Sequence, residues 1–152
     1  MSFTRPGGTR ERPLYRLSVL GNASSPALQY LGVGADGEYA IFLLGPKATA
    51  SGDDGACVVD VGCRVIGLRK GDRLGVDVEV AGSPSRHYVA EVTVLRRLVM
   101  RSAGRAAAWR KRVDPIGREV LRTLGEDDAT GAAMRRLRYS PVTGTVGLTS
   151  AP

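Results

Sequence analysis

The chain has 152 residues, of which 43% are hydrophobic and 5% aromatic, and it carries a formal net charge of +7 at neutral pH. The length fits one domain with a tail at one or both ends, and the hydrophobic fraction excludes a chain that is disordered by composition. No apolar run approaches 18 residues, which excludes a membrane-spanning helix.

The first twelve residues, MSFTRPGGTRER, are expected to form a flexible N-terminal arm, because they are polar and contain Gly and Pro. The arm lacks the apolar middle segment of a secretory signal peptide. We therefore expect a location in the cytoplasm or within a particle, and no secretion.

Residues 13–95 are expected to form a small antiparallel β-barrel or sandwich of about six or seven strands. Apolar and polar residues alternate there in short segments, and Gly, Pro, Asn or Asp stand between the segments. The expected strands cover residues 13–20, 27–33, 38–44, 56–61, 64–68, 73–80 and 86–95. Short strands at this regular spacing are typical of barrels and sandwiches rather than of a βαβ fold.

The clearest local prediction is a hairpin near the end of this β domain. In RLGVDVEV (73–80), Leu74, Val76, Val78 and Val80 fall on one face of a strand. The segment AGSPS (81–85) then provides a turn, and HYVAEVTVL follows as the second strand. On that strand we expect the face that begins with Tyr88 to be the more apolar one. A further turn is expected at residues 70–72 (KGD).

Two cysteines, Cys57 and Cys63, lie in apolar, strand-like sequence. They have no neighbouring Cys or His residues that could complete a zinc site. We interpret them as two reduced, buried thiols.

After residue 95 the pattern changes to that of a helical extension (96–139) and an extended tail (140–152). The segment RSAGRAAAWRKR is rich in residues that favour helices. Asp114 and Pro115 can start a helix whose apolar stripe contains Ile116, Val120 and Leu124, and Gly125 can end it. A second short helix is expected over GAAMRRLRY (131–139).

The charge is distributed unevenly along the chain. The front region (residues 1–95) holds ten basic and ten acidic side chains, whereas the back region (residues 96–152) holds twelve basic and five acidic ones. Within residues 95–113 there are seven Lys and Arg and no acid. Such asymmetry indicates a polyanionic partner, although the same arginines could equally cover the solvent face of a helix.

The candidate polyanion-binding residues lie in this basic run. If the run is helical, Arg101, Arg105 and Arg112 lie near one face, with Trp109 close by for stacking on bases. The full predicted set is Arg96, Arg97, Arg101, Arg105, Trp109, Arg110, Lys111 and Arg112.

Candidate catalytic residues are few. The single histidine, His87, has no nucleophile at a recognisable spacing, and Asp53 and Asp54 lie in a loop by composition. The segment GVGADG (32–37) lacks the Lys and Ser/Thr of a phosphate-binding loop and is interpreted as a hairpin turn. We therefore expect no enzymatic activity, no catalytic residues, no bound metal and no cofactor.

Two segments resemble the PilZ family of β-barrels. Arg12 and Arg16 have an RxxxR spacing just ahead of a strand, and residues 67–97 (GLRKGDRLGVDVEVAGSPSRHYVAEVTVLRR) are similar to the closing hairpin of that barrel. The family's second motif, D/N-x-S-x-x-G, is absent. The resemblance implies a six-stranded barrel with a C-terminal helix, in which Arg12 and Arg16 would bind cyclic diguanylate.

Three functions are therefore expected from the sequence. The first is a non-catalytic binding or structural module whose basic back region contacts nucleic acid or an acidic protein surface. The second is a PilZ-like receptor for cyclic diguanylate. The third is a structural subunit of a virion or a ribosome-like particle, in which the basic run forms contacts within a homo-oligomer or a multi-subunit assembly.

Overall fold

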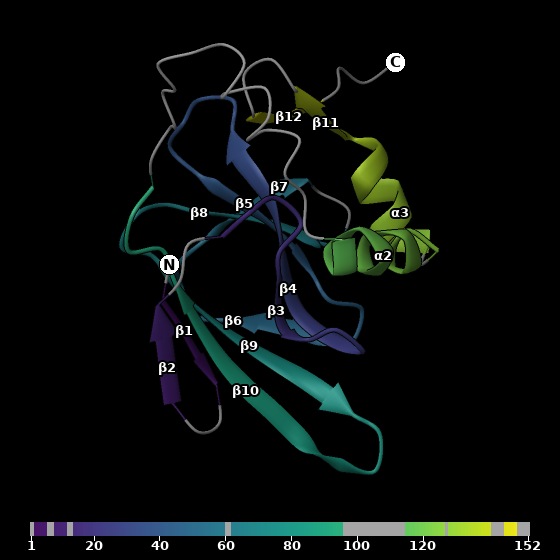
Figure 1. The fold of residues 1–152 in the computed structure, drawn as a ribbon. Coiled ribbons are helices and arrows are strands. Elements are labelled where there is room, and N and C mark those ends of the chain that lie inside the picture. The colour runs from purple at the N-terminus through teal and green to yellow at the C-terminus, as the bar shows by residue number, and fades with distance from the viewer. Residues whose placement is uncertain are drawn as a thin grey trace.

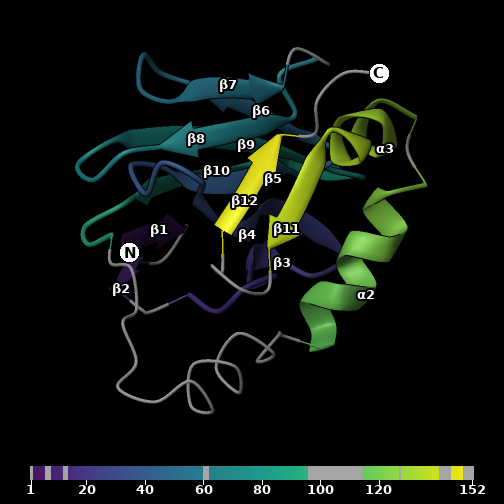
Figure 2. The ribbon, with the colours of Figure 1, turned by 90° about the horizontal axis from the view of Figure 1, so that it is seen from above.

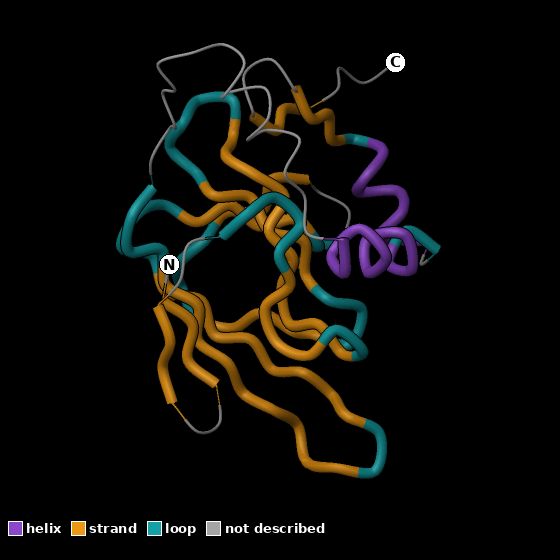
Figure 3. Tube along the Cα trace, viewed as in Figure 1, coloured by secondary structure: helices purple, strands orange, loops and turns teal. Residues whose placement is uncertain are grey.

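A computed structural model of the chain describes residues 2–5, 8–11, 14–59, 62–95, 115–126, 128–140 and 145–148. The described part is mainly β, as the sequence predicts, and two helices cover one flank (Figures 1 and 3). None of its helices has both the length and the apolar character needed to span a membrane.

The first of two sheets is antiparallel and has the strand order β2-β1-β10-β9-β6. Its strands are β1 (Ser2–Arg5), β2 (Gly8–Glu11), β6 (Ala48–Ser51), β9 (Arg73–Val80) and β10 (Ser83–Glu91). The N-terminal arm therefore differs from the expected flexible segment, because β1 and β2 form a hairpin and β1 pairs with β10. The β9–β10 hairpin is confirmed, but its turn consists only of Ala81 and Gly82. Gly82 adopts a left-handed φ of 72° that tightens this turn.

The second sheet is curled and has the order β11-β12-β4-β5-β8-β7, with β3 paired to β4. Its strands are β3 (Val19–Asn22), β4 (Ser25–Gly34), β5 (Ala40–Leu44), β7 (Ala56–Val59), β8 (Val65–Leu68), β11 (Leu137–Ser140) and β12 (Thr145–Leu148). The pairing of β12 with β4 is parallel, so this sheet is not purely antiparallel as expected. The GVGADG segment is the predicted turn only in its second half: residues 35–37 lie between β4 and β5, whereas residues 32–34 still belong to β4.

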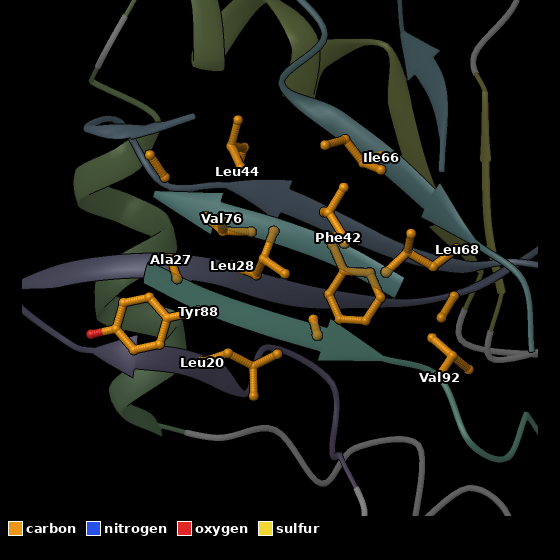
Figure 4. Packing of buried hydrophobic residues seen from close by; sticks show 14 of the residues in the cluster. Leu20, Ala27, Leu28, Phe42, Leu44, Ile66, Leu68, Val76, Tyr88 and Val92 are labelled. Carbon is orange, nitrogen blue, oxygen red and sulfur yellow. The ribbon is translucent and has the colours of Figure 1, made fainter. Parts of the chain in front are cut away.

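The main core lies between the two sheets (Figure 4). Leu74, Val76 and Val78 of β9 point into it, as the alternating pattern predicts, and Tyr88 lies on the inner face of β10. The curled sheet supplies Leu28 and Phe42, among others, from its inner face. These side chains remove a large apolar area from water, which is the main stabilising contribution to the fold.

A second core covers the outer face of the curled sheet. Here Ile41, Leu43 and Val65 pack against Val120 and Leu124 of the helical flank. Because β5 is buried on both faces, all five of its residues are buried, which explains why its sequence AIFLL is continuously apolar rather than alternating.

The flank consists of α2 (Pro115–Leu124) and α3 (Asp128–Arg135), which lie beside the curled sheet in Figure 2. Both helices are where the sequence predicts them, but α3 begins three residues earlier and ends at Arg135. The segment expected to complete the second helix instead forms β11, which pairs with β12 from the predicted tail. Two short strands near the end of the chain thus extend the curled sheet.

The two cysteines differ from the prediction. Cys57 and Cys63 form a disulfide, with Cα atoms 5.2 Å apart. Cys57 is exposed and Cys63 is half-buried. Gly62 and Cys63 both adopt left-handed backbone conformations, with φ of 61° and 50°. They turn the chain back on itself within a few residues, so the two sulfur atoms meet.

Candidate anion-binding site

The structure tests only part of the predicted polyanion site. The run that contains Arg96 to Arg112, with Trp109, lies outside the described residues, as does Arg12. Arg16 lies within them. Its surroundings define the candidate site.

Arg16 joins the front region to the back region. It lies just before β3, and its guanidinium carbon is 3.7 Å from the centre of the Tyr139 ring on β11. A guanidinium at this distance from an aromatic face is attracted by the ring's quadrupole. The Arg16 side chain is thereby held in one orientation by a residue from the far end of the sequence.

A tight turn positions Arg16. The Ser18 amide donates to the Tyr15 carbonyl at 3.0 Å, and the Tyr15 amide donates to Ser18 Oγ at 3.1 Å. Leu17 takes a left-handed conformation with φ of 66°, and its amide donates to the carbonyl of Tyr30 at 2.7 Å. The turn is therefore fixed to β4 by backbone hydrogen bonds.

A buried glutamine fixes α2 against the same turn. Gln29 of β4 is fully buried, and its Nε2 donates to the Leu17 carbonyl at 3.1 Å and to the Gly117 carbonyl. Gly117 itself approaches Leu17 so closely that a Cβ at this position would overlap the Leu17 carbonyl oxygen. Arg16 and Arg118 flank these two packed residues, so two guanidinium groups come near each other at the junction.

The electrostatics of this junction are positive. Burial lowers the pKa of the Arg16 guanidinium, Tyr139 opposes that change, and the nearby Arg118 adds to it. The buried Nε of Arg16 has no hydrogen-bond partner among the described residues. Neither Arg16 nor Arg118 forms an ion pair with a carboxylate in the described part of the chain. An anion placed here would relieve the repulsion between the two guanidinium groups.

Several exposed arginines of the described back region resemble Arg16 in forming no ion pair with a described carboxylate. Arg118, Arg136 and Arg138 are exposed and form no ion pair with any described carboxylate, whereas Arg122 pairs with Glu119 at 2.6 Å and with Glu126 at 3.1 Å. In the front region Arg69 pairs with Glu38 and Arg73 pairs with Glu91, each at 3.6 Å, whereas no ion pair with a described carboxylate is formed by the exposed side chains of Lys47, Lys70 and Arg86. Cations without a described ion pair therefore occur in both regions, and what distinguishes the back region is its excess of basic over acidic residues.

The other residues considered from the sequence lie elsewhere. His87 Nδ1 is 2.8 Å from Asp77 Oδ1 across the β9–β10 hairpin, on the exposed face of the first sheet. Ser51 Oγ and His87 Cε1 lie 2.5 and 3.2 Å from the position that a Cβ on Gly75 would occupy. These groups sit together on an open sheet face, so we interpret them as a polar surface cluster.

The paired aspartates also have a local role. Asp54 Oδ2 accepts a hydrogen bond of 2.8 Å from the Arg73 amide, which ties the loop to β9. Within the described residues, no group of three or more His, Cys, Asp or Glu side chains is placed to hold a metal ion.

The sequence points to Arg16 but to none of its neighbours. Gln29 does carry a signal, because it is a polar residue within the apolar segment ALQYLGV. Tyr139 and Arg118 carry none, because their approach to Arg16 depends on how α2 and β11 dock. No family model, no curated protein and no solved structure matches this chain.

Proposed function

We propose that the protein is a non-catalytic binding module whose back region contacts a polyanion, with nucleic acid as the first candidate. The observation that carries the proposal is the half-buried Arg16 guanidinium, which is stacked on Tyr139, lies near Arg118 and has no described carboxylate partner. The predicted residues Arg96 to Arg112 would add phosphate contacts, and Trp109 would stack on bases.

Two physical arguments support a phosphate-bearing partner. Guanidinium groups pair with phosphate oxygens through two parallel hydrogen bonds. Such a pair is more favourable when the guanidinium is already held in one orientation, because less side-chain entropy is lost on binding. Arg16 is oriented by Tyr139 and by the turn on β4. In addition, the front region is neutral overall and its described salt bridges use Arg69 and Arg73, so the excess positive charge belongs to the back region.

The test is the salt dependence of binding to a fluorescent single strand of about 20 nucleotides and to a duplex of about 20 base pairs. For the double variant Arg118→Gln/Arg138→Gln we expect weaker binding. Its logarithmic salt slope should be smaller by about 0.7 to 0.9 for each phosphate group that the variant no longer neutralises. The triple variant Arg105→Gln/Arg110→Gln/Arg112→Gln should reduce the slope further.

Arg122→Gln is the matched control. It removes one positive charge from the same helix as Arg118, but that guanidinium is already paired with Glu119 and Glu126. The affinity and the salt slope should therefore stay close to those of the parent protein. If the double and triple variants bind as the parent does, the polyanion proposal is wrong.

The second candidate is a small-ligand receptor of PilZ type, in which Arg12 and Arg16 bind cyclic diguanylate. The orientation of Arg16 by Tyr139 favours it, because a stacked guanidinium can hold a phosphodiester. Calorimetry with cyclic diguanylate would give heat that Arg16→Gln abolishes. Absence of heat at high micromolar ligand would end this candidate.

The third candidate is a subunit of a virion or ribosome-like particle, in which the basic residues contact an acidic protein surface or a neighbouring copy. Its test measures the elution mass of the purified chain and its ratio of absorbance at 260 and 280 nm. Both are measured before and after the addition of about 1 M salt, because salt at that concentration screens exposed phosphate pairing. Nucleic acid that is released by salt supports the first proposal. A discrete oligomer that is unchanged by salt supports the third.

A further inference from the structure

A hollow of about 440 Å³ lies on the side of the curled sheet where β7 approaches β12. Its size falls within the range of small-molecule sites, which is roughly 300 to 1,000 Å³. The floor is the turn between β4 and β5, and the walls come from β7 and from the β11–β12 pair. The lining residues are Gly34, Ala35, Asp36, Tyr39, Ile41, Ala56, Cys57, Val58, Leu137, Val146, Gly147 and Leu148.

The walls of this hollow are apolar. Ile41, Val58 and Val146 pack in or against the second core, and Leu148 is a large hydrophobic residue with 55% of its surface exposed. Cys57 contributes a disulfide sulfur rather than a thiol. Such walls favour a hydrocarbon or aromatic group over a polar one.

One charged side chain lines the hollow, the carboxylate of Asp36. Its Oδ1 accepts the Glu38 amide at 2.9 Å, which fixes the carboxylate in the turn. Among the described residues no Lys, Arg or His forms an ion pair with Asp36, while the neighbouring Glu38 pairs with Arg69. The Arg69 guanidinium lies 4.8 Å from the ring centre of the lining residue Tyr39, but its described ion pair is with Glu38. The hollow therefore combines an apolar body with one oriented carboxylate that has no described ion pair.

A second hollow provides a comparison. It lies between α2 and the β3–β4 turn, has a volume of about 690 Å³ and also contains a single charged side chain, Glu119. That carboxylate is already neutralised by Arg122 at 2.6 Å. Of these two hollows, only the first thus presents a carboxylate that has no described ion pair.

We propose that the hollow between β7 and β12 binds a small organic cation, namely a primary amine attached to a compact aromatic or aliphatic group. The ammonium group would pair with Asp36, and the apolar group would lie against Ile41, Val58 and Val146. The site shares β11 with the Arg16 junction, since Leu137 lines the hollow and Tyr139 stacks on Arg16, but none of its lining residues belongs to that junction and the proposal does not rest on polyanion binding. Attraction of a cation to a chain of net charge +7 requires a local carboxylate, because the overall field opposes it.

The test uses three probes of nearly equal shape: phenethylamine, the neutral 2-phenylethanol and the anionic phenylacetate. Each is titrated into the full-length protein while amide and methyl NMR signals are followed. The amine should bind at least about tenfold more tightly than the acid, with the alcohol between them, and should shift the signals of Ile41, Val58 and Val146. A tenfold ratio corresponds to about 1.4 kcal/mol.

Asp36→Asn is the decisive variant. The amide oxygen of asparagine can still accept the Glu38 amide, so the turn is kept while the charge is removed. We expect the affinity for phenethylamine to fall to that of the alcohol, and the affinity for the alcohol to stay unchanged. Glu79→Gln is the matched control, since it removes an exposed carboxylate from β9, outside the hollow.

Three results would overturn the proposal. They are equal affinity for amine and alcohol, an unchanged amine affinity in Asp36→Asn, and signal shifts that map to another part of the protein. If none of the three probes binds at millimolar concentration, the proposal is also wrong. The comparison of the three probes and the mapping of the shifts are made on the parent protein, so these two parts of the test do not depend on whether Asp36→Asn folds.

Discussion

The front and back regions of this protein differ in what holds them and in their net charge. Among the described residues, the main core between the two sheets is built from the front region alone, whereas the second core needs both regions, since Ile41 and Val65 meet Val120 and Leu124 there. The front region has ten basic and ten acidic side chains, while the back region has twelve basic and five acidic ones. The back region thus adds cationic groups to a β domain that already has a core of its own.

This comparison also identifies where the regions are joined. Gln29 links the Leu17 and Gly117 carbonyls, and Arg16 stacks on Tyr139. A change at this junction should affect the back region first. A change within the main core should affect the whole molecule.

The largest effect is expected for Gly117→Ala. Alanine normally favours a helix by about 1 kcal/mol over glycine, but a Cβ here would severely overlap the Leu17 carbonyl oxygen, so α2 must move away from the turn that contains Leu17. Overpacking typically costs about 1 to 3 kcal/mol and occasionally more, and so severe an overlap belongs at the upper end. After the gain in helix propensity we expect a net loss of about 2 kcal/mol or more in the free energy of unfolding. Urea denaturation followed by circular dichroism measures it.

Gly125→Ala is the control for this variant, because a Cβ there meets its nearest atoms at ordinary distances of 3.4 Å or more. It should leave the unfolding free energy nearly unchanged. Hydrogen exchange sharpens the comparison: in Gly117→Ala the amides of α2 and α3 should exchange faster, while those of β9 and β10 keep their protection. Equal loss of protection in both regions would show that the molecule unfolds as a single unit.

The sequence predicts much of the front region because its strands follow simple periodicity. β9 and β10 bury alternate residues, so their pairing and their inner faces can be read directly from Leu74, Val76 and Tyr88. Strand β6 (ATAS) is not predicted because its small residues give almost no pattern, and it forms only because β9 offers an edge to pair with. Tertiary context decides the structure of such segments.

The candidate site is less accessible to sequence analysis. The spacing from Arg12 singles out Arg16, but the contact of Arg16 with Tyr139 depends on the formation of β11 where a helix end is expected. The segment LRYS has no strong preference, and its pairing with β12 decides between helix and strand. β12 is in turn held by its parallel pairing with β4, far away in the sequence, and pairing at that separation leaves no local trace in a single sequence.

The next largest effect is expected at the disulfide on the edge of the front region. Cys57 and Cys63 are six positions apart, and closing so short a loop lowers the entropy of the unfolded chain enough to contribute about 2 kcal/mol. Reduction, or the double variant Cys57→Ser/Cys63→Ser, should lower the unfolding free energy by that amount and speed hydrogen exchange in β7.

The double variant is its own control, because a reductant should not change its stability further. A thiol titration that finds two free thiols in the protein purified without reductant would contradict the disulfide. The same thiol titration, made on protein whose free thiols are blocked inside the cell, tests the expected cytoplasmic or particle location. A disulfide already present there would argue against a reducing cytoplasm, because structural disulfides persist mainly in oxidising compartments.

The smallest effect is expected from pH, and it tests whether the two regions interact electrostatically. Burial raises the pKa of Tyr30 to about 12, and Tyr139 contributes to the same rise. Since the unfolded value is near 10, this stabilisation is complete below about pH 10 and is lost as the pH rises toward 12. We expect the parent protein to lose about 1 kcal/mol more than Tyr30→Phe between about pH 8 and pH 11. In Tyr139→Phe the ionisation of Tyr30, followed by ultraviolet absorbance, should move to lower pH, because the Coulombic contribution of Tyr139 that raises the pKa of Tyr30 is removed. If the ionisation of Tyr30 is unchanged in Tyr139→Phe, the front region alone determines the pKa of Tyr30.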